Sequence, residues 1–390
     1  MNKFALLYNF NYFDYSLLLY LIFFSIFLLT YIKAKIKLSS NIVFFLFLYH
    51  NLIFLIYTYY QITVGSDSMS YFLDSAKYVR TNIQPSNFLY KIAGHFVSLN
   101  ISFHLVNYIF SIISFTPFIF FLKIIEKLKI YERSKIDYFI VVSILFFPSL
   151  HFWISGFSKD TISFVAIFFS SYLYIAREDS WLPKTSNTLF IALIFFLTFL
   201  LYFVRPHLAL LIFVSSFVYY LIKIRYSFLT FKYIFVLILA LLMLYFLLNA
   251  VFGEKLSYRG IVDTLTFFRD LNIEGTKSQI DIETIFIVKF IYYLISPNFF
   301  TYSSLTSFDI IVVIENTILI FFFLKLFEFN FSSIKFSVFS LTMVVLFFLS
   351  MTVITSNLGI SNRQKWMVFL PLITIFLYAR FYPKNLKFSK

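Results

Sequence analysis

The chain of 390 residues is strongly apolar, with 61% hydrophobic and 13% charged residues and a mean hydropathy of +0.87. Soluble domains carry about 25% charged residues, so this composition excludes an ordinary water-soluble globular protein. The formal charge of +14 does not indicate a nucleic-acid partner, because the Lys and Arg residues lie between apolar runs, where membrane topology and lipid headgroups account for them.

Apolar runs of about 18 to 21 residues recur along the chain, and each is long enough to cross a hydrocarbon core of about 30 Å. In lipid the backbone must satisfy its own hydrogen bonds, and runs without polar alternation predict helices rather than barrel strands. We therefore expect an all-α polytopic integral membrane protein with about eleven spanning helices, forming one membrane domain over residues 1–390. The spans are expected near residues 15–32, 42–62, 104–122, 138–156, 161–176, 188–204, 208–222, 233–252, 308–324, 336–355 and 367–379.

The connections between these spans alternate between two faces, and basic residues crowd one of them. More than half of the 32 Lys and Arg residues follow the odd-numbered spans. The positive-inside rule makes that face cytoplasmic, which places the N-terminus outside and the C-terminus inside. Two long segments, 63–103 and 253–307, lie on the outer face, and long loops of compact proteins are usually functional.

Both outer loops have helical periodicity of their own. Apolar stripes predict interfacial helices over 88–99 and 258–271. The run 284–296 is apolar except for Lys289 and ends before Pro297. It is too short to span a bilayer, so we expect a re-entrant or interfacial helix there.

The strongest local pattern is VGSDSMSY at 64–71, where the second span reaches the outer face. Ser66 or Asp67 is expected to cap a short helix, on which Asp67, Tyr71 and Asp74 share one face. Along that helix the two carboxylates would be about 10 Å apart, too far to share a metal ion. The alternative is that Asp67 only caps the helix and the acidic face is solvated.

A second pattern, WISGFSKD at 153–160, forms a tight outer turn between two spans. Adjacent residues cannot face each other on a helix, so Lys159 and Asp160 each need another partner or a ligand at the membrane surface. The alternative is that Asp160 merely caps the following helix.

Two further outer turns carry arginine. In YFVRPH at 202–207, Pro206 suits the first turn of the next helix and follows Arg205. In SNRQKW at 361–366, Arg363 stands shortly before the last span. No topological rule asks for positive charge on this face, although snorkelling to headgroups is the alternative for both arginines.

These four turns come from distant parts of the chain but are predicted at one membrane depth. A shared cavity would hold Asp67, Lys159, Arg205 and Arg363, with Arg80 and Arg259 as further candidates. Arg binds phosphate oxygens bidentately, and Lys supplies a compact charge. One carboxylate facing such a cationic wall suits transfer from a lipid-linked diphosphate: the cations stabilise the leaving group, and the carboxylate takes the acceptor's proton.

Polar residues also lie inside the predicted spans, namely His50, Asn51, Glu315 and Asn316. Intramembrane ionisable groups are candidates for function, and Glu315, about two turns from the outer end of its span, is expected to line the same cavity. A structural Glu, paired or kept neutral by burial, is an equal alternative.

Metal binding is weakly indicated. The chain has no cysteine, which excludes thiolate sites, and its histidines form no helical H-x-x-x-H pair. The predicted arrangement requires no cofactor, and a divalent metal ion stays an open alternative.

At these residues the sequence resembles the polysaccharide polymerases of the EpsG and Wzy type, which are similar to the wider class of multi-span, GT-C-like glycosyltransferases with polyprenyl-linked donors. The matched residues are Gly65, Asp67 and Tyr71 after the second span, Ser155, Gly156, Lys159 and Asp160 in the turn that opens a helix, Arg205-Pro206, and Arg363. Arg and Gln are commoner in the family at the positions of Lys159 and Asp160, so that match is partial.

The resemblance implies joining of oligosaccharide repeat units carried on undecaprenyl diphosphate, at the outer face of a bacterial cytoplasmic (inner) membrane. The products would be O-antigen of lipopolysaccharide, capsule or exopolysaccharide, and a chain-length regulator is a further partner to expect. Asp67 is the expected acid/base or acceptor-orienting residue, with Arg205 also at the reacting centre. Lys159, Arg205 and Arg363 would bind the diphosphate, and the sugar or acceptor candidates are Tyr71, Asp74, Asp160, His207 and Glu315.

Three alternatives stay open. One is a polyprenyl-phosphate-dependent transferase that adds a single sugar. Another is a transporter or flippase for a lipid-linked sugar, but alternating access predicts repeat symmetry and polar groups through the membrane depth, and the sequence shows neither. The third is a purely structural membrane subunit, against which the long outer loops argue.

Overall fold

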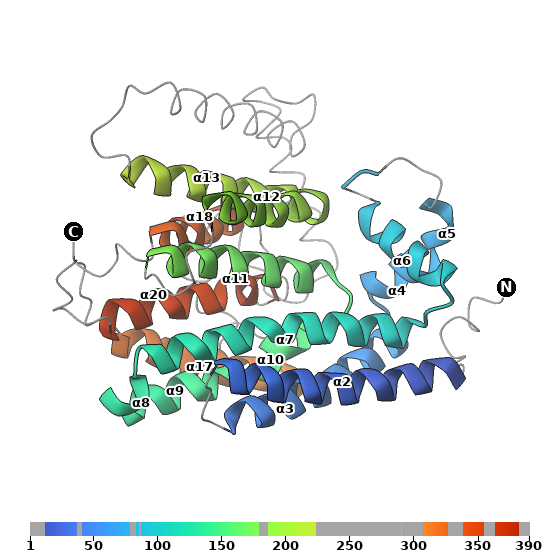
Figure 1. Cartoon of the computed structure of the whole chain (residues 1–390), viewed down its shortest axis with the longest axis horizontal. Coiled ribbons are helices and arrows are strands. Elements are labelled where there is room, and N and C mark those ends of the chain that lie inside the picture. The colour runs from blue at the N-terminus through green and yellow to red at the C-terminus, as the bar shows by residue number, and fades with distance from the viewer. Residues whose placement is uncertain are drawn as a thin grey trace. The chain divides into compact units, whose positions relative to one another are not determined.

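The computed structural model describes residues 12–36, 41–78, 83–85, 87–178, 186–223, 290, 307–326, 338–354 and 363–381. Within these ranges every regular element is a helix, which confirms the all-α class for the described part of the chain (Figure 1). The chain divides into two compact units, unit 1 (Met1–Val165) and unit 2 (Ala166–Lys390). The single membrane domain over 1–390 stays a prediction.

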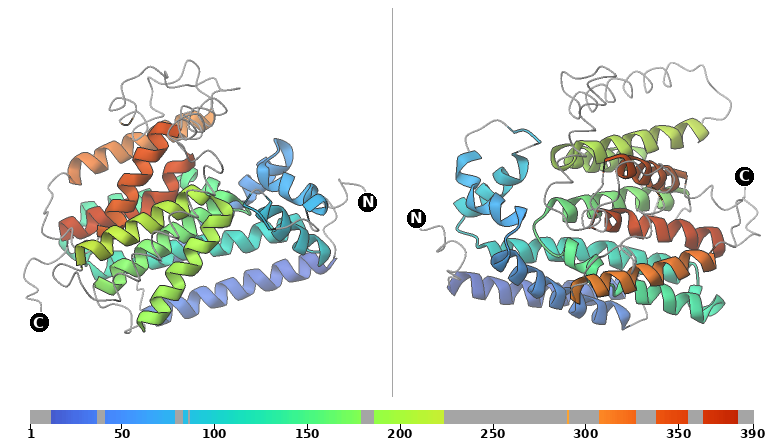
Figure 2. Two further views of the ribbon diagram at one scale, coloured as in Figure 1. Left: turned by 90° about the horizontal axis from the view of Figure 1, so that it is seen from above. Right: turned by 180° about the vertical axis from the view of Figure 1, so that it is seen from behind.

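Unit 1 is a set of long apolar helices with a group of short helices. Its elements are α2 (Tyr12–Ile36), α3 (Ile42–Thr63), α4 (Asp67–Leu73), α5 (Ser75–Tyr78), α6 (Phe88–Ser98), α7 (Phe103–Lys127), α8 (Ile130–Arg133), α9 (Lys135–Leu145), α10 (Pro148–Ile154) and the start of α11 (Lys159–Glu178). Helix α7 packs against α2 and α3, and α10 also packs against α3. The short helices α4, α5 and α6 pack on one another (Figure 2).

Helix α3 shows why these runs form helices that suit lipid. Residues spaced three or four apart, such as His50, Phe54, Tyr57 and Gln61, are buried against the neighbouring helices. The opposite face is also apolar, with Leu52, Leu55 and Tyr59 among its exposed side chains. A helix that is apolar all round is expected where the outward face meets lipid instead of water.

Three described helices are long and apolar enough to cross a membrane: α3, α7 and α12 (Asn187–Val204). A fourth span results if α9 and α10, bent by 40°, count as one. Shorter apolar helices cover Leu19–Tyr31, Pro206–Ile222, Ile310–Phe322 and Val338–Thr352. The total of about eleven spans stays a prediction, and the span expected at 233–252 lies outside the described residues.

The span expected at 138–156 is not one straight helix. Helix α9 ends at Leu145 and α10 begins at Pro148. Proline has no backbone N–H to donate to the preceding turn, and its ring disfavours helical geometry at the residue before it, here Phe147, which is extended. The break therefore comes from Pro148, which does not interrupt the apolar run in the sequence.

Unit 2 contains the rest of α11 and six further described elements: α12, α13 (Pro206–Lys223), α17 (Ser307–Leu326), α18 (Val338–Ile354), the 3-10 helix η3 (Trp366–Val368) and α20 (Phe369–Phe381). Helix α13 packs against α12 and α18, and α18 packs against α20. Aromatic rings fill its core: Tyr174 stacks on Phe339 at 4.0 Å between ring centroids and meets the edge of Tyr219 at 4.6 Å.

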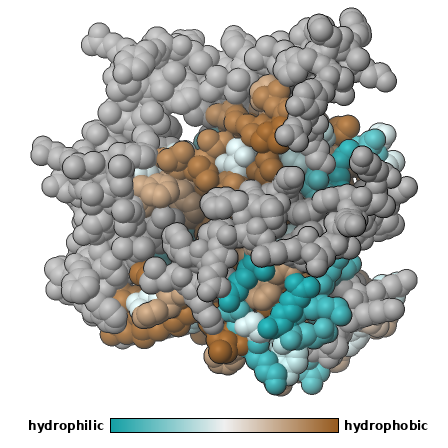
Figure 3. All heavy atoms as spheres, turned by 90° about the vertical axis from the view of Figure 1, so that its left-hand side faces the viewer, coloured by the Kyte–Doolittle hydropathy of each residue, from teal (hydrophilic) through white to brown (hydrophobic). Residues whose placement is uncertain are grey.

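Charged residues gather where α7, α8 and α9 join. Lys127, Lys129, Glu132 and Arg133 are exposed there, and Figure 3 shows hydrophilic side chains on the face that includes this end of the helices. Lys129 and Glu132 form a surface ion pair at 3.4 Å. This connection is one of those that the sequence predicts on the cytoplasmic side, because basic residues concentrate in it.

Candidate functional site

The chain turns sharply where α3 ends. Gly65 has a φ of +92°, a left-handed conformation that favours glycine. Ser66 then accepts a hydrogen bond from the Met69 amide at 3.2 Å, so Ser66 is the residue that caps α4. Asp67 is the first residue of α4 and is exposed. Its negative charge stands where the helix dipole favours one.

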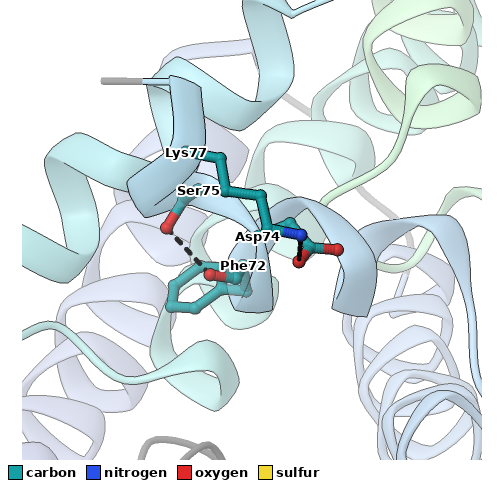
Figure 4. Close-up of polar contacts among 4 residues, drawn as sticks. All are labelled: Phe72, Asp74, Ser75 and Lys77. Atoms are coloured by element: carbon teal, nitrogen blue, oxygen red, sulfur yellow. Dashed lines mark hydrogen bonds and ion pairs between the residues drawn. The ribbon is translucent and has the colours of Figure 1, made fainter. Parts of the chain in front are cut away.

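The helix that begins at Asp67 is shorter than predicted. Helix α4 ends at Leu73, so Asp67 and Asp74 do not share the face of one continuous helix. Asp74 instead pairs with Lys77 at 2.8 Å, while Ser75 donates to the Phe72 carbonyl at 2.8 Å (Figure 4). The hydrogen bond from Lys77 to Asp74 raises the pKa of Lys77.

Tyrosines connect α4, α5 and α6. Tyr71 is buried, and its ring meets the Tyr90 ring edge-on, with 4.9 Å between the ring centroids. The centroids of the Tyr90 and Tyr78 rings are 4.3 Å apart. Partial burial raises the pKa of Tyr90, and the nearby Tyr78, Asp74 and Asp67 raise it further. Both Asp67 and Asp74 therefore raise the pKa of the same residue, Tyr90. We call Asp67, Tyr71, Asp74, Lys77, Tyr78 and Tyr90 the α4–α6 cluster.

The second motif is held in a tight turn between α10 and α11. Ser158 accepts from the Thr161 amide at 3.1 Å and so caps α11, the role that sequence reasoning considered for Asp160. Asp160 is buried in the first turn of α11. A Cβ on Gly156 would lie only 2.8 Å from Asn107 Oδ1 and 2.9 Å from the Tyr57 ring, so this turn has room for glycine alone.

The two motifs meet in unit 1. The Tyr71 and Phe157 rings are edge-to-face at 6.2 Å, and Lys159 Nζ lies 5.8 Å from the Tyr71 ring centroid. An ammonium over an aromatic face is stabilised by the ring quadrupole. Segments 64–71 and 153–160, almost ninety residues apart in the sequence, therefore form one local site with Tyr71 at its centre.

Asn107, a residue that sequence reasoning missed, joins the two motifs. It is fully buried on α7, accepts from the Phe157 amide at 2.8 Å, and donates to Gln61 at 2.9 Å. Gln61 lies on α3 one turn before Gly65. One amide side chain thus fixes both the end of α3 and the turn that precedes Lys159.

Asn107 and Gln61 belong to a polar seam between α3, α7 and α10. Its members are His50, Gln61, Asn107, Ser111, Ser114 and His151, all buried. On α7 they recur at helical spacing, positions 107, 111 and 114, inside an apolar run. That spacing is the sequence signal that could have revealed a buried polar face.

In unit 2, Arg205 stands at the junction of α12 and α13. Its amide donates to the Leu201 carbonyl at 2.6 Å, and its carbonyl accepts from Leu208 and Ala209. Pro206 begins α13, as the sequence predicts, and His207 follows, half-buried. The backbone of Arg205 therefore makes the last amide hydrogen bond of α12 and accepts the first ones of α13.

The last described stretch begins with Arg363, which is half-exposed. Two residues later, the buried Lys365 donates to Asn316 on α17 and interacts electrostatically with the buried Glu315. Glu315 thus lies near the Lys365 side chain, and its place in a shared cavity stays a prediction. Lys365 was part of the predicted turn but was not singled out, because nothing local indicates its burial.

The predicted site residues are therefore distributed over both units. Asp67, Tyr71, Asp74, Lys159 and Asp160 lie in unit 1, whereas Arg205, His207, Glu315 and Arg363 lie in unit 2. One cavity shared by all of them stays a prediction. Arg80, Arg259 and the helix expected at 258–271 lie outside the described residues, and of the run 284–296 only Phe290 is described.

Among the described residues, no group of three or more His, Asp or Glu side chains is placed to hold a metal ion.

A scan against protein-family models and searches of curated proteins and of solved structures give no match to this chain. The resemblance to the polymerases therefore stays a prediction, carried by the matched residues themselves.

Proposed function

We propose that the protein is a membrane glycosyltransferase that polymerises undecaprenyl-diphosphate-linked oligosaccharide repeat units at the outer face of a bacterial cytoplasmic membrane. In this proposal it spans the membrane about eleven times, with the N-terminus outside and a GT-C-like fold. One observation supports it above the others: the segment after α3 that carries Asp67 and the start of α11 that carries Lys159 meet at Tyr71.

The chemistry needs a base and a cation on either side of the reacting carbon. Asp67 lies one turn before Tyr71 on α4, and the Lys159 ammonium faces the Tyr71 ring. The acceptor hydroxyl forms a bond to the anomeric carbon and gives its proton to the Asp67 carboxylate. The bond from that carbon to the diphosphate breaks, and Lys159 stabilises the negative charge of the leaving group.

Other residues have narrower roles in the proposal. Asp74 would contact the sugar as a hydrogen-bond acceptor, and the buried Tyr71 would shape the sugar groove from beneath it. Arg205 and Arg363 are proposed for the diphosphate on the sequence argument, because an arginine fork matches phosphate oxygens.

The test is deletion of the gene in its host, complementation with variants, and analysis of surface polysaccharide length on gels. Deletion should leave chains of one repeat unit, and the wild-type chain should restore long polymer. Asp67→Asn and Arg205→Ala should fail to restore it while inserting normally. His95→Gln, on the exposed part of α6, is the control variant and should restore full length.

Each contrary result overturns a defined part of the proposal. Full-length polymer from both Asp67→Asn and Arg205→Ala would refute the assignment of the site. If the deletion strain carries no lipid-linked unit on the outer face, the flippase alternative replaces the polymerase. If the repeat unit of the deletion strain lacks one sugar, a single-sugar transferase replaces the polymerase in the proposal.

The topology in the proposal can be tested separately, because the chain has no native cysteine. Ser70 and Glu132 are both exposed and are expected on opposite faces. In intact cells, a membrane-impermeant thiol reagent should label Ser70→Cys and should label Glu132→Cys only after permeabilisation. The reverse pattern would invert the orientation.

A further inference from the structure

Two buried histidines face each other in the polar seam. His50 on α3 and His151 on α10 are 1% and 0% exposed, and their Nδ1 atoms are 2.7 Å apart. A contact of this length between two ring nitrogens requires one hydrogen between them. The proposed glycosyl transfer does not use this pair. The positions of the ring hydrogens follow from which neighbouring atoms can donate a hydrogen bond and which can only accept one.

The hydrogen on His151 is fixed by the helix break. Helix α9 ends at Leu145, and the Leu145 carbonyl lies 2.6 Å from His151 Nε2. A carbonyl only accepts, so Nε2 of His151 must carry a hydrogen. His151 thereby satisfies a carbonyl at the end of α9, which the apolar surroundings would otherwise leave without a donor.

The hydrogen on His50 follows from that assignment. In a neutral His151, Nδ1 is an acceptor, so the shared hydrogen belongs to Nδ1 of His50. Nε2 of a neutral His50 then has a lone pair, yet it lies 3.0 Å from the Ser111 carbonyl and 3.2 Å from Ser114 Oγ. Ser114 Oγ is itself 2.8 Å from the same carbonyl.

In the triangle of these three atoms, the contact between neutral His50 Nε2 and the Ser111 carbonyl contains no hydrogen, although that carbonyl also accepts a backbone N–H within α7. His50 Nε2, Ser111 O and Ser114 Oγ all accept, and only the Ser114 hydroxyl brings a hydrogen, which can serve one neighbour at a time. One more proton on His50 Nε2 would donate to the Ser111 carbonyl and leave the Ser114 hydroxyl free to do the same. No heavy atom has to move.

We infer that the His50–His151 pair is a binding site for one proton. The added proton comes from a hydronium ion of the aqueous phase, which becomes water. It binds the lone pair of His50 Nε2 and gives the pair a single positive charge, shared through the hydrogen between the two Nδ1 atoms. The inference rests on this geometry alone and is independent of the proposed glycosyl transfer.

Burial of both rings disfavours the added charge, and the neighbouring aromatic rings offset part of that cost. Phe118 stacks on His151 at 4.7 Å, and Phe115 lies 5.6 Å from His50, so aromatic faces meet the charge. From α3 itself the titratable Tyr49 faces His151 at 5.1 Å. The α7 side contributes Ser111 and Ser114 with these phenylalanines, and the α9–α10 side contributes the Leu145 carbonyl.

Proton binding would act on the motif turn through α10. His151 accepts a hydrogen bond at its carbonyl from Ser155, the residue that begins the turn leading to Lys159. A proton that strengthens the contact of α10 with α3 would therefore hold the turn in place. The same short helix carries both the histidine and the turn.

The direct test is nitrogen NMR of the full chain, labelled at its five histidines and reconstituted in lipid vesicles. Between roughly pH 3 and 8, a range that extends well below neutral because burial disfavours a charged ring, the two rings should change together, take up about one proton per pair, and show coupling across the N–H···N bond. Rings that stay neutral throughout, or that titrate independently of each other, would overturn the inference.

Variants make the result specific. His50→Asn keeps a donor near the Nδ1 position but removes Nε2, so the proton uptake should disappear; exposed His95→Gln should leave it unchanged. If His50→Asn does not fold, Ser114→Ala is the second variant. Among the described residues, Ser114 is the hydroxyl that can donate to neutral His50 Nε2, so its removal should raise the midpoint of uptake by up to about one pH unit, the scale of one hydrogen bond. No rise, or a fall, contradicts the inference.

Discussion

The α4–α6 cluster and the polar seam both gather polar side chains in unit 1, but in opposite surroundings. In the cluster, the side chains of Lys77 and Asp74 are 69% and 31% exposed, so water competes for each charge. In the seam, Asn107 and Gln61 are fully buried, so a lost hydrogen-bond partner leaves a polar group in an apolar interior. The cluster thus presents charged groups to solvent, while the buried amides hold the end of α3 and the turn that leads to Lys159 in place.

The largest effect is expected from Asn107→Ala. The substitution leaves the Phe157 amide and the Gln61 side chain without their partner, at a cost of about 2–4 kcal/mol in the free energy of unfolding. Thermal unfolding in detergent measures it. Asn51→Ala is the matched control, since Asn51 donates to the Phe47 carbonyl within its own helix. Equal unfolding temperatures for the two variants would show that the seam does not stabilise unit 1.

Gly156→Ala should follow in size. Its Cβ would overlap Asn107 Oδ1 and the Tyr57 ring, which costs about 1–3 kcal/mol as overpacking. In the double variant with Asn107→Ala, Asn107 Oδ1 is absent and part of the overlap is removed. The double variant should therefore lose less stability than the sum of the losses of the two single variants. Strict additivity in the same unfolding assay would mean that the turn accommodates a methyl group without touching Asn107.

Ser66→Ala tests the cap at the edge of the exposed cluster. Loss of the acceptor for the Met69 amide should destabilise α4 by about 1 kcal/mol. Hydrogen exchange at that amide should accelerate, while amides of α7 keep their protection. Ser70→Ala is the control, because Ser70 is exposed and its hydroxyl donates to the Ser66 carbonyl at 3.4 Å. Equal exchange in the two variants would assign the helix start to packing instead of capping.

The smallest effect is expected from Asp74→Asn, which removes the exposed ion pair. The pKa of Lys77 is raised in the folded chain, so the contribution of the pair is present at neutral pH and is lost only as the pH rises through the alkaline range of lysine. Because water screens the pair, the variant should unfold only slightly below the wild type at neutral pH, and the gap should close in that alkaline range. A large loss of stability at neutral pH would show that the cluster is more rigid than its exposure implies.

Within the described residues, the helical class and the positions of several helices are predictable from the sequence alone. The run expected at 188–204 is α12 at Asn187–Val204, and the helix expected at 88–99 is α6 at Phe88–Ser98. These features are local, because the length of an apolar run, its periodicity and a serine at its start act within a few residues. The segments at 64–71 and 153–160 are also predicted at one membrane depth from their position at span ends, and the cavity expected to join them with Arg205 and Arg363 stays a prediction.

Tertiary structure decided which polar side chains meet inside the protein. His50 and His151 are 101 positions apart, and Asn107 and Phe157 are 50 apart. Each lies in an apolar run whose pattern does not say which neighbour its buried face will contact. Only the packing of α3, α7 and α10 selects these partners, because a hydrogen bond between helices depends on the rotation of each helix about its axis. The same packing turned the acidic and basic segments, readable as motifs, into a site centred on Tyr71.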